Sequence, residues 1–121
     1  MTVAILRQRD YLIASIQGDL SDSQILAFRD DLADRIGKQR ARGVIVDVAA
    51  LDVIDSFVAR ALRSLAVTAR LRGAETIIVG IQPDVAIAMA HFDLNLTPLR
   101  TALDLDEALP TLDQLTGAAG V

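Results

Sequence analysis

Strand-like and helix-like segments alternate along almost the whole chain, and this alternation limits the possible folds more than any other feature of the sequence. Short runs rich in aliphatic and β-branched residues predict strands at residues 3–6, 11–16, 44–48, 76–79 and 99–101. Segments with helical spacing of apolar residues follow the last four, which gives the order β-β-α-β-α-β-α-β-α. This order predicts an α/β domain with a mostly parallel sheet of four to five strands and one antiparallel strand near its start.

Local signals mark the first two helices. The stretch Ser21-Asp22-Ser23-Gln24 matches a capping box, and the helix that it opens is expected to run to about residue 41, with Gly43 as its stop. A second helix is predicted over residues 56–71 and is closed by Gly73. The apolar stripe of the first helix consists of Ile25, Phe28, Leu32 and Ile36.

The last two helices carry equally clear start signals. Pro83 suits the first position of a helix predicted over residues 83–91. Asp104-Leu105-Asp106-Glu107 matches a second capping box, which opens the final helix. The chain of 121 residues is 52% hydrophobic, so we expect one domain over residues 1–115 and a flexible tail over residues 116–121.

Charge and composition exclude several classes of function. The chain has no cysteine, which excludes disulfides and thiolate chemistry. A net charge of −4 without any tryptophan argues against nucleic-acid binding. No apolar run is long enough to span a membrane, and the first residues lack the pattern of a signal peptide. We therefore expect a cytoplasmic protein without a nucleic-acid or membrane partner.

A single serine stands where the predicted central strand and a short acidic loop lead into the second helix. Ser56 lies among backbone N–H groups without helical partners and at the positive end of the helix dipole. A serine there is either an N-cap, stabilising the helix by about 1 kcal/mol, or an acceptor for a phosphate of roughly −1.5 to −2 charges. The residues around Ser56 leave both interpretations open.

Catalysis by this chain is not predicted. The acidic loop before Ser56 contains Asp47, Asp52 and Asp55. A receiver domain would also need an acidic pair after its first strand and a lysine late in its sheet, but Lys38, the only lysine, falls in the first helix. His91, the only histidine, falls late in the third helix, a poor position for a catalytic base or metal ligand. We therefore expect no catalytic residue, metal or cofactor.

Two motifs resemble the STAS domain, the fold of anti-sigma-factor antagonists. They are Ile54-Asp55-Ser56-Phe57-Val58 and Gly80-Ile81-Gln82-Pro83, and the similarity extends to about residue 115. Soluble antagonists of the family tend to carry a glycine shortly after the phosphorylated serine, where this chain has Phe57 and Val58. This departure favours the stressosome branch. Ala88 occupies the place where related stressosome subunits tend to have a second phosphorylatable threonine.

The resemblance implies a non-enzymatic scaffold that works through Ser56. Such a protein forms dimers, assembles with RsbR-type STAS paralogues into a pseudo-icosahedral particle and sequesters an RsbT-type serine kinase. The kinase, which brings its own ATP and Mg²⁺, phosphorylates Ser56 and is released, and a serine phosphatase resets the site. The residues expected to bind the kinase or another partner are Asp52, Asp55, Phe57, Val58 and Arg60.

Two other functions remain open at this stage. One is an anti-anti-sigma factor that acts in a small partner-switching complex. The other is a STAS module that binds a small ligand in the crevice at the carboxyl ends of the strands.

Overall fold

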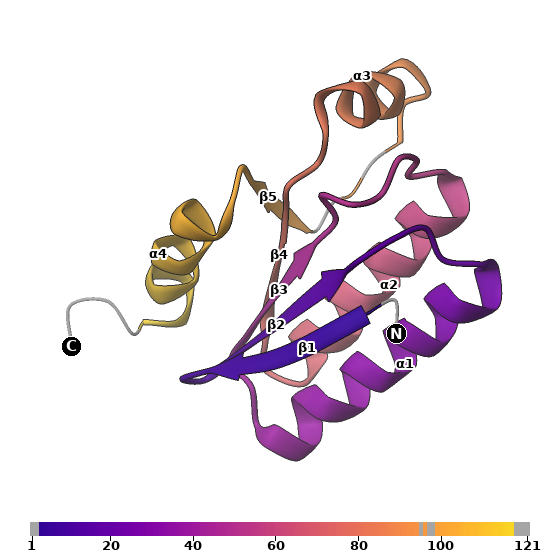
Figure 1. Ribbon diagram of the computed structural model, residues 1–121. Helices are drawn as coiled ribbons and strands as arrows, with labels where there is room; N and C mark the ends of the chain where they lie inside the picture. Colours follow the sequence, from indigo (N-terminus) through magenta and orange to yellow (C-terminus); the bar gives the residue numbers. More distant parts are fainter. Residues whose placement is uncertain (1–2, 95, 97–98, 118–121) are drawn as a thin grey trace.

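The computed structural model describes residues 3–94, 96 and 99–117. The elements follow the predicted order, and Figure 1 shows them as β1 (Val3–Gln8), β2 (Tyr11–Ile16), α1 (Asp22–Gln39), β3 (Gly43–Asp47), α2 (Ser56–Leu71), β4 (Glu75–Val79), α3 (Pro83–His91), β5 (Arg100–Ala102) and α4 (Leu105–Thr116). The predicted α/β class is confirmed. No helix in the described ranges is both long enough and apolar enough to cross a lipid bilayer.

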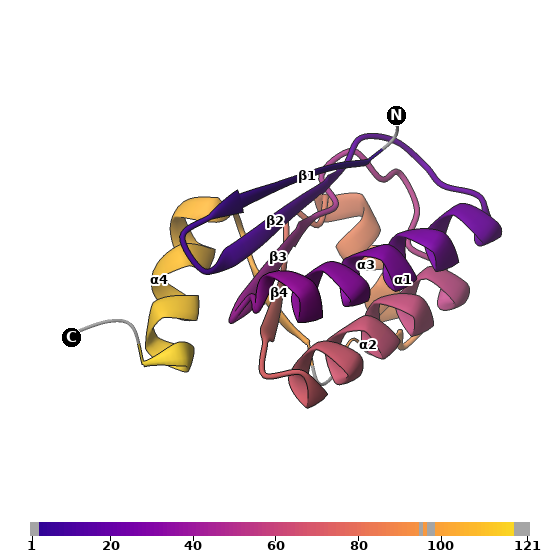
Figure 2. The ribbon, with the colours of Figure 1, turned by 90° about the horizontal axis from the view of Figure 1, so that it is seen from below.

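The five strands form one sheet in the order β1-β2-β3-β4-β5. β1 runs antiparallel to β2, and the other neighbouring pairs are parallel, as the alternation of elements predicts. Helices α1 and α2 cover one face of the sheet, α4 covers the other, and α3 lies beyond the carboxyl ends of the strands (Figures 1 and 2). The loops at those ends therefore meet beside α3.

β3 is the centre of the core. The side chains of Val44, Ile45 and Val46 are all completely buried. Val44 and Val46 belong to the apolar cluster under α1 and α2, whereas Ile45 belongs to the cluster under α4. A strand that is covered on both faces needs apolar residues at successive positions, which explains the unbroken Val-Ile-Val run.

The end of α1 differs from the prediction. The helix stops at Gln39, and the residue in the left-handed conformation is Arg40, with φ of 52°. Gly43 is instead the first residue of β3, so its predicted role as the helix stop is wrong. A Cβ atom at Gly43 would lie 2.9 Å from Tyr11 Cδ1 and 3.0 Å from a methyl carbon of Leu112. The glycine is needed because α4 packs closely against the strand there.

Smaller differences affect the C-terminal part of the chain. β5 begins and ends one residue later than predicted. Asp104 caps α4 by accepting a hydrogen bond from the Glu107 backbone N–H. Among the described residues, the Glu107 side chain does not accept the reciprocal bond from the Asp104 backbone N–H, so only one of the two bonds of the predicted capping box forms. α4 continues to Thr116, which the prediction placed in the tail, and residues 118–121 lie outside the described part.

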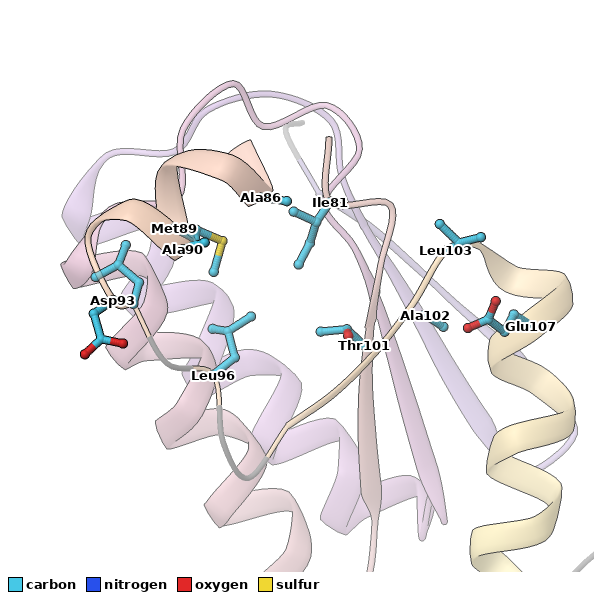
Figure 3. Close-up of a pocket in the computed structure, with 11 residues that line it drawn as sticks. Ile81, Ala86, Met89, Ala90, Asp93, Leu96, Thr101, Ala102, Leu103 and Glu107 are labelled. Carbon is cyan, nitrogen blue, oxygen red and sulfur yellow. The ribbon is translucent and has the colours of Figure 1, made fainter. Parts of the chain in front are cut away.

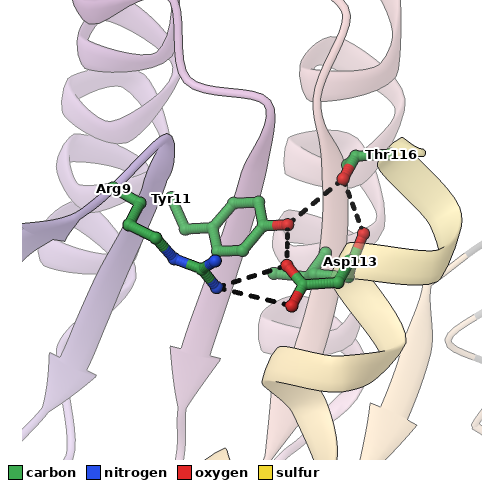
Figure 4. A network of polar contacts seen from close by, with 5 residues as sticks. Arg9, Tyr11, Asp113 and Thr116 are labelled. Carbon is green, nitrogen blue, oxygen red and sulfur yellow. Dashed lines mark hydrogen bonds and ion pairs between the residues drawn. The ribbon is translucent and has the colours of Figure 1, made fainter. Parts of the chain in front are cut away.

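A polar network fastens α4 to the start of β2 (Figure 4). The Tyr11 hydroxyl donates a 2.5 Å hydrogen bond to Asp113 Oδ1 and lies 3.1 Å from Thr116 Oγ1. Arg9 forms an ion pair with Asp113 at 3.3 Å. The bond from Tyr11, followed by the charge of Arg9, lowers the pKa of Asp113. Burial and the bond to Asp113 raise the pKa of Tyr11.

Replacing Gly43 with alanine tests the close packing between β3 and α4. We expect Gly43→Ala to lower the free energy of unfolding by about 1–3 kcal/mol, because the added methyl group collides with Tyr11 and Leu112. Gly18→Ala is the matched control, since nothing lies within 4 Å of a Cβ at that position. Equal urea-denaturation midpoints for the two variants would contradict this role of Gly43.

The network at Asp113 predicts a pH dependence of stability. Because the pKa of Asp113 in the folded protein is below its ordinary value of 3.8, its contribution is present above that value and is lost as the pH falls through the folded pKa. We expect Asp113→Asn to flatten the loss of stability that urea titrations measure as the pH falls below the ordinary Asp value of 3.8. Asp106→Asn, on the exposed side of α4, serves as the control. Its free energy of unfolding should fall more steeply with decreasing pH than that of Asp113→Asn.

Candidate functional site

The loop from β3 to α2 is held in place by its neighbours at the carboxyl end of the sheet. Asp47 Oδ1 accepts a 2.9 Å hydrogen bond from the Ala49 backbone N–H, and the Gln82 side-chain amide donates to the Ala49 carbonyl at 2.5 Å. The start of α3 therefore contacts the loop directly. The Asp47 carboxylate therefore stabilises the turn after β3 and is not a free carboxylate beside Ser56.

Gly80 allows the end of β4 to approach this loop. Its φ is +81°, a left-handed conformation that favours glycine. A Cβ atom at this position would also lie 3.0 Å from both Asp47 Oδ1 and the Ala49 Cβ. Each polar or conformationally special residue of the Gly-Ile-Gln-Pro turn thus has a separate role. Gly80 lets β4 approach the loop after β3, Gln82 bonds to that loop, and Pro83 begins α3.

Asp55, not Ser56, is the N-cap of α2. The Asp55 carboxylate accepts a 2.9 Å hydrogen bond from the Val58 backbone N–H, and the backbone of Asp55 is extended. Ser56 is the first residue of the helix proper. The interpretation of Ser56 as the cap is therefore wrong: the helix begins one residue earlier than a serine cap requires, and the carboxylate of Asp55 accepts the capping bond instead.

Ser56 is exposed and stands beside an apolar groove. Within the described part of the chain, its hydroxyl forms no hydrogen bond. The groove has a volume of about 480 Å³ and lies between the loop before α2 and helix α3. We call it the serine groove. It is lined by Asp52, Val53, Ile54, Asp55, Ser56, Asp84, Val85, Ala88, Phe92 and Leu94.

The walls of the serine groove combine exposed apolar side chains with carboxylates. Val53 is 61% exposed and Phe92 is 71% exposed, so both walls of the groove present apolar surface to solvent. Asp52 and Asp55 lie on one wall and Asp84, in the first turn of α3, on the other. This surface has the properties of a protein-docking site for a partner with apolar and basic groups.

The predicted site residues do not all reach the groove. Asp52 and Asp55 line it together with Ser56. Phe57 and Val58 are partly buried and pack against the core under α1 and α2. Arg60 is exposed on α2, one turn beyond Ser56, and is absent from the groove lining.

Sequence reasoning missed the wall that α3 contributes. Asp84, Val85 and Phe92 belong to this wall. Ala88 also lies there, although it was notable in the sequence only because related proteins tend to have a threonine at that position. The position of Pro83 just after β4 was the available signal, because carboxyl ends of parallel strands gather at one edge of a sheet. That signal indicates the neighbourhood but not which side of α3 faces Ser56.

Neither His91 nor Lys38, the two side chains weighed as catalytic groups in the sequence, lines the serine groove. His91 is exposed at the end of α3, where its ring meets the Phe92 ring edge-on at 5.0 Å, and it does not line the serine groove. Lys38 forms an ion pair with Asp34 on α1, 3.0 Å away. Across the described ranges, no group of three or more metal-ligating side chains is placed to hold a metal ion.

The sheet order, the antiparallel first strand and the four helices define the α/β fold of the STAS class. Residues 2–108 match the sequence profile of the STAS domain, and the chain belongs to this family. The family resemblance carried by the motifs around Ser56 and Gly80 is thereby confirmed.

Three relatives place the chain near stressosome proteins. A glutamate-substituted RsbS from Moorella thermoacetica is 33% identical, with a TM-score of 0.80 over 97% of this chain and 99% of that one. A chain in a solved structure of the stressosome is 31% identical, with a TM-score of 0.71 over 93% of this chain and 97% of that one. The RsbT co-antagonist protein RsbRA of Bacillus subtilis is 22% identical over 86% of this chain, which spans only 38% of its length.

The role of Asp55 can be separated from that of Ser56 by three substitutions. We expect Asp55→Ala to lower the free energy of unfolding by about 1 kcal/mol, because it removes the cap of α2. Asp55→Asn should retain most of the stability, since asparagine caps as well as aspartate does. Ser56→Ala should change it by less than about 0.5 kcal/mol. Chemical denaturation measures all three, and a larger loss from Ser56→Ala than from Asp55→Ala would reverse the assignment.

Proposed function

We propose that this protein is a non-enzymatic scaffold of the RsbS type that holds an RsbT-type serine kinase and is phosphorylated by it on Ser56. The availability of the Ser56 hydroxyl carries the proposal. Because Asp55 caps α2, the hydroxyl is exposed and has no structural bond within the described residues that a phosphate would break. The first turn of a helix also accommodates a phosphate electrostatically.

The serine groove supports both binding and release of the kinase. Its apolar wall at Val53 and Phe92 offers contact area, and its carboxylates attract a basic partner surface. A phosphate on Ser56 would add roughly −1.5 to −2 charges beside Asp52, Asp55 and Asp84. The kinase surface that contacts the neutral Ser56 hydroxyl would then face a bulkier and strongly hydrated anion. We infer that the phosphate weakens the complex locally while the domain stays folded.

The family context supports a phosphorylation switch and an assembly. SpoIIAA, an anti-sigma factor antagonist of similar fold, exists in an unphosphorylated and a phosphorylated form. RsbRA is named as a co-antagonist of RsbT, and its similarity to this chain supports a shared particle built from STAS paralogues. In our proposal this particle is pseudo-icosahedral and cytoplasmic, this chain contributes dimers to it, and a serine phosphatase resets Ser56.

Phosphorylation with the cognate kinase and ATP, followed by mapping of the modified residue, tests the switch directly. We expect wild type to be labelled and Ser56→Ala to lose more than about 90% of the label, because the exposed hydroxyl is the acceptor. Ser64→Ala, another exposed serine on α2, is the matched control and should be labelled like wild type. Undiminished labelling of Ser56→Ala would end the proposal.

Release of the kinase is tested by binding rather than by labelling. Ser56→Asp should keep the circular dichroism and thermal stability of wild type yet bind the kinase at least about tenfold more weakly, which corresponds to 1.4 kcal/mol. Size-exclusion chromatography with an RsbR-type partner then separates the stressosome role from the small partner-switching complex. A megadalton peak supports the former, and a small complex supports the latter.

A further inference from the structure

A second apolar groove lies on the other side of α3 (Figure 3). Its volume is about 620 Å³, and it is bounded by α3, the residues that follow β4, the end of β5 and the start of α4. We call it the α3–α4 groove. The residues that shape its chemistry are Ile81, Met89, Leu96, Thr101, Leu103 and Glu107.

The floor of the α3–α4 groove is apolar and its rim is acidic. Met89 and Leu96 are buried beneath it, and Leu103 is 79% exposed at its edge. Asp93 and Glu107 provide the charges, and no basic side chain lines the groove among the described residues. A methionine in the floor adapts to different apolar partners. The polar atoms on the rim are therefore suited to a partner that brings hydrogen-bond donors and positive charge.

The charge distribution of the whole domain favours the same kind of partner. The loops and first helical turns at the carboxyl ends of the parallel strands are rich in acids, among them Asp52, Asp55, Asp84, Asp104 and Asp106. At the opposite end, α1 and α2 finish with Lys38, Arg40, Arg70 and Arg72. An acidic end attracts basic partners over distances longer than direct contact.

The shape indicates a helix rather than a small molecule. Two helices, α3 and α4, flank the groove (Figure 3), and two of its lining residues, Ala90 and Leu103, are exposed to solvent. Small-molecule sites usually enclose 70–90% of their ligand, which an open trough does not. Amphipathic helices commonly bind such troughs through an apolar stripe, with charged residues along the rim.

We propose that the α3–α4 groove docks an amphipathic helix of a protein partner, with apolar anchors on the floor and Lys or Arg facing Asp93 and Glu107. This site is distinct from the serine groove because α3 separates the two. Val85 and Ala88 line the serine groove, whereas Ala86, Met89 and Ala90 line the α3–α4 groove, and the two grooves share Leu94, which follows α3.

Two synthetic peptides of about 14 residues with the same leucine stripe test the proposal, one with lysine and the other with glutamate on the polar face. Fluorescence anisotropy and amide NMR shifts report binding to the full chain. We expect the lysine peptide to bind at least about tenfold more tightly and to shift the amides of Met89, Thr101 and Leu103. Because the titration contains no kinase or nucleotide, its outcome does not depend on phosphorylation of Ser56.

Matched variants distinguish the groove from general charge attraction. Glu107→Lys should weaken binding of the lysine peptide about tenfold. Asp106→Lys, which places the same charge in the same turn of α4 outside the groove lining, should change it less than about threefold. Leu103→Asp should weaken binding, whereas Leu71→Asp, at an 83% exposed leucine of α2, should not. Circular dichroism checks that each variant is folded.

Three results would overturn the proposal: no saturable binding of the lysine peptide, equal affinity for both peptides, or equal losses from Glu107→Lys and Asp106→Lys. Amide shifts centred on Val53 and Phe92 would overturn it as well, because they would assign the peptide to the serine groove.

Discussion

The burial of β3 on both faces is the constraint on which the rest of the structure depends. Val44 and Val46 need cover from α1 and α2, and Ile45 needs cover from α4, so helices are required on both sides of the sheet. The parallel connections that bring those helices into place also bring every loop after β3, β4 and β5 to one end of the molecule. The site at that end follows from how the core is covered.

At that end, the backbone conformation at Gly80 and the unpaired N–H groups at the start of α2 determine how the functional side chains are placed. Gly80 allows the turn after β4 to contact the loop before α2, and Gln82 fastens the two together. Asp55 satisfies the start of α2, which releases Ser56 from a structural role. Ser56 therefore presents an exposed hydroxyl on a fixed helix start, whereas a serine at the N-cap position would have its hydroxyl bonded to the helix backbone.

α3 gives this end of the domain two faces. The helix separates the serine groove from the α3–α4 groove, and both combine an apolar floor with carboxylates. An exposed Phe92 and an exposed Leu103 are costly for a solitary domain and reasonable for a subunit that works through partners. The proposed scaffold role and the proposed second docking site therefore share one physical basis, the incomplete cover of apolar surface around α3.

The sequence by itself determined the order of the elements, the direction of the strands and the apolar stripe of α1, because these depend on local periodicity and on capping signals such as Ser21. It also indicated the neighbourhood of Ser56. Tertiary structure decided that Arg40 rather than Gly43 ends α1, that Asp55 rather than Ser56 caps α2, and that Asp84 and Phe92 join the site. The positions of Gly43, Asp84 and Phe92 depend on contacts between segments far apart in the chain, which leave no local pattern to read. The cap of α2 is a local bond, but Asp55 and Ser56 are neighbours that both suit an N-cap, so the sequence could not choose between them.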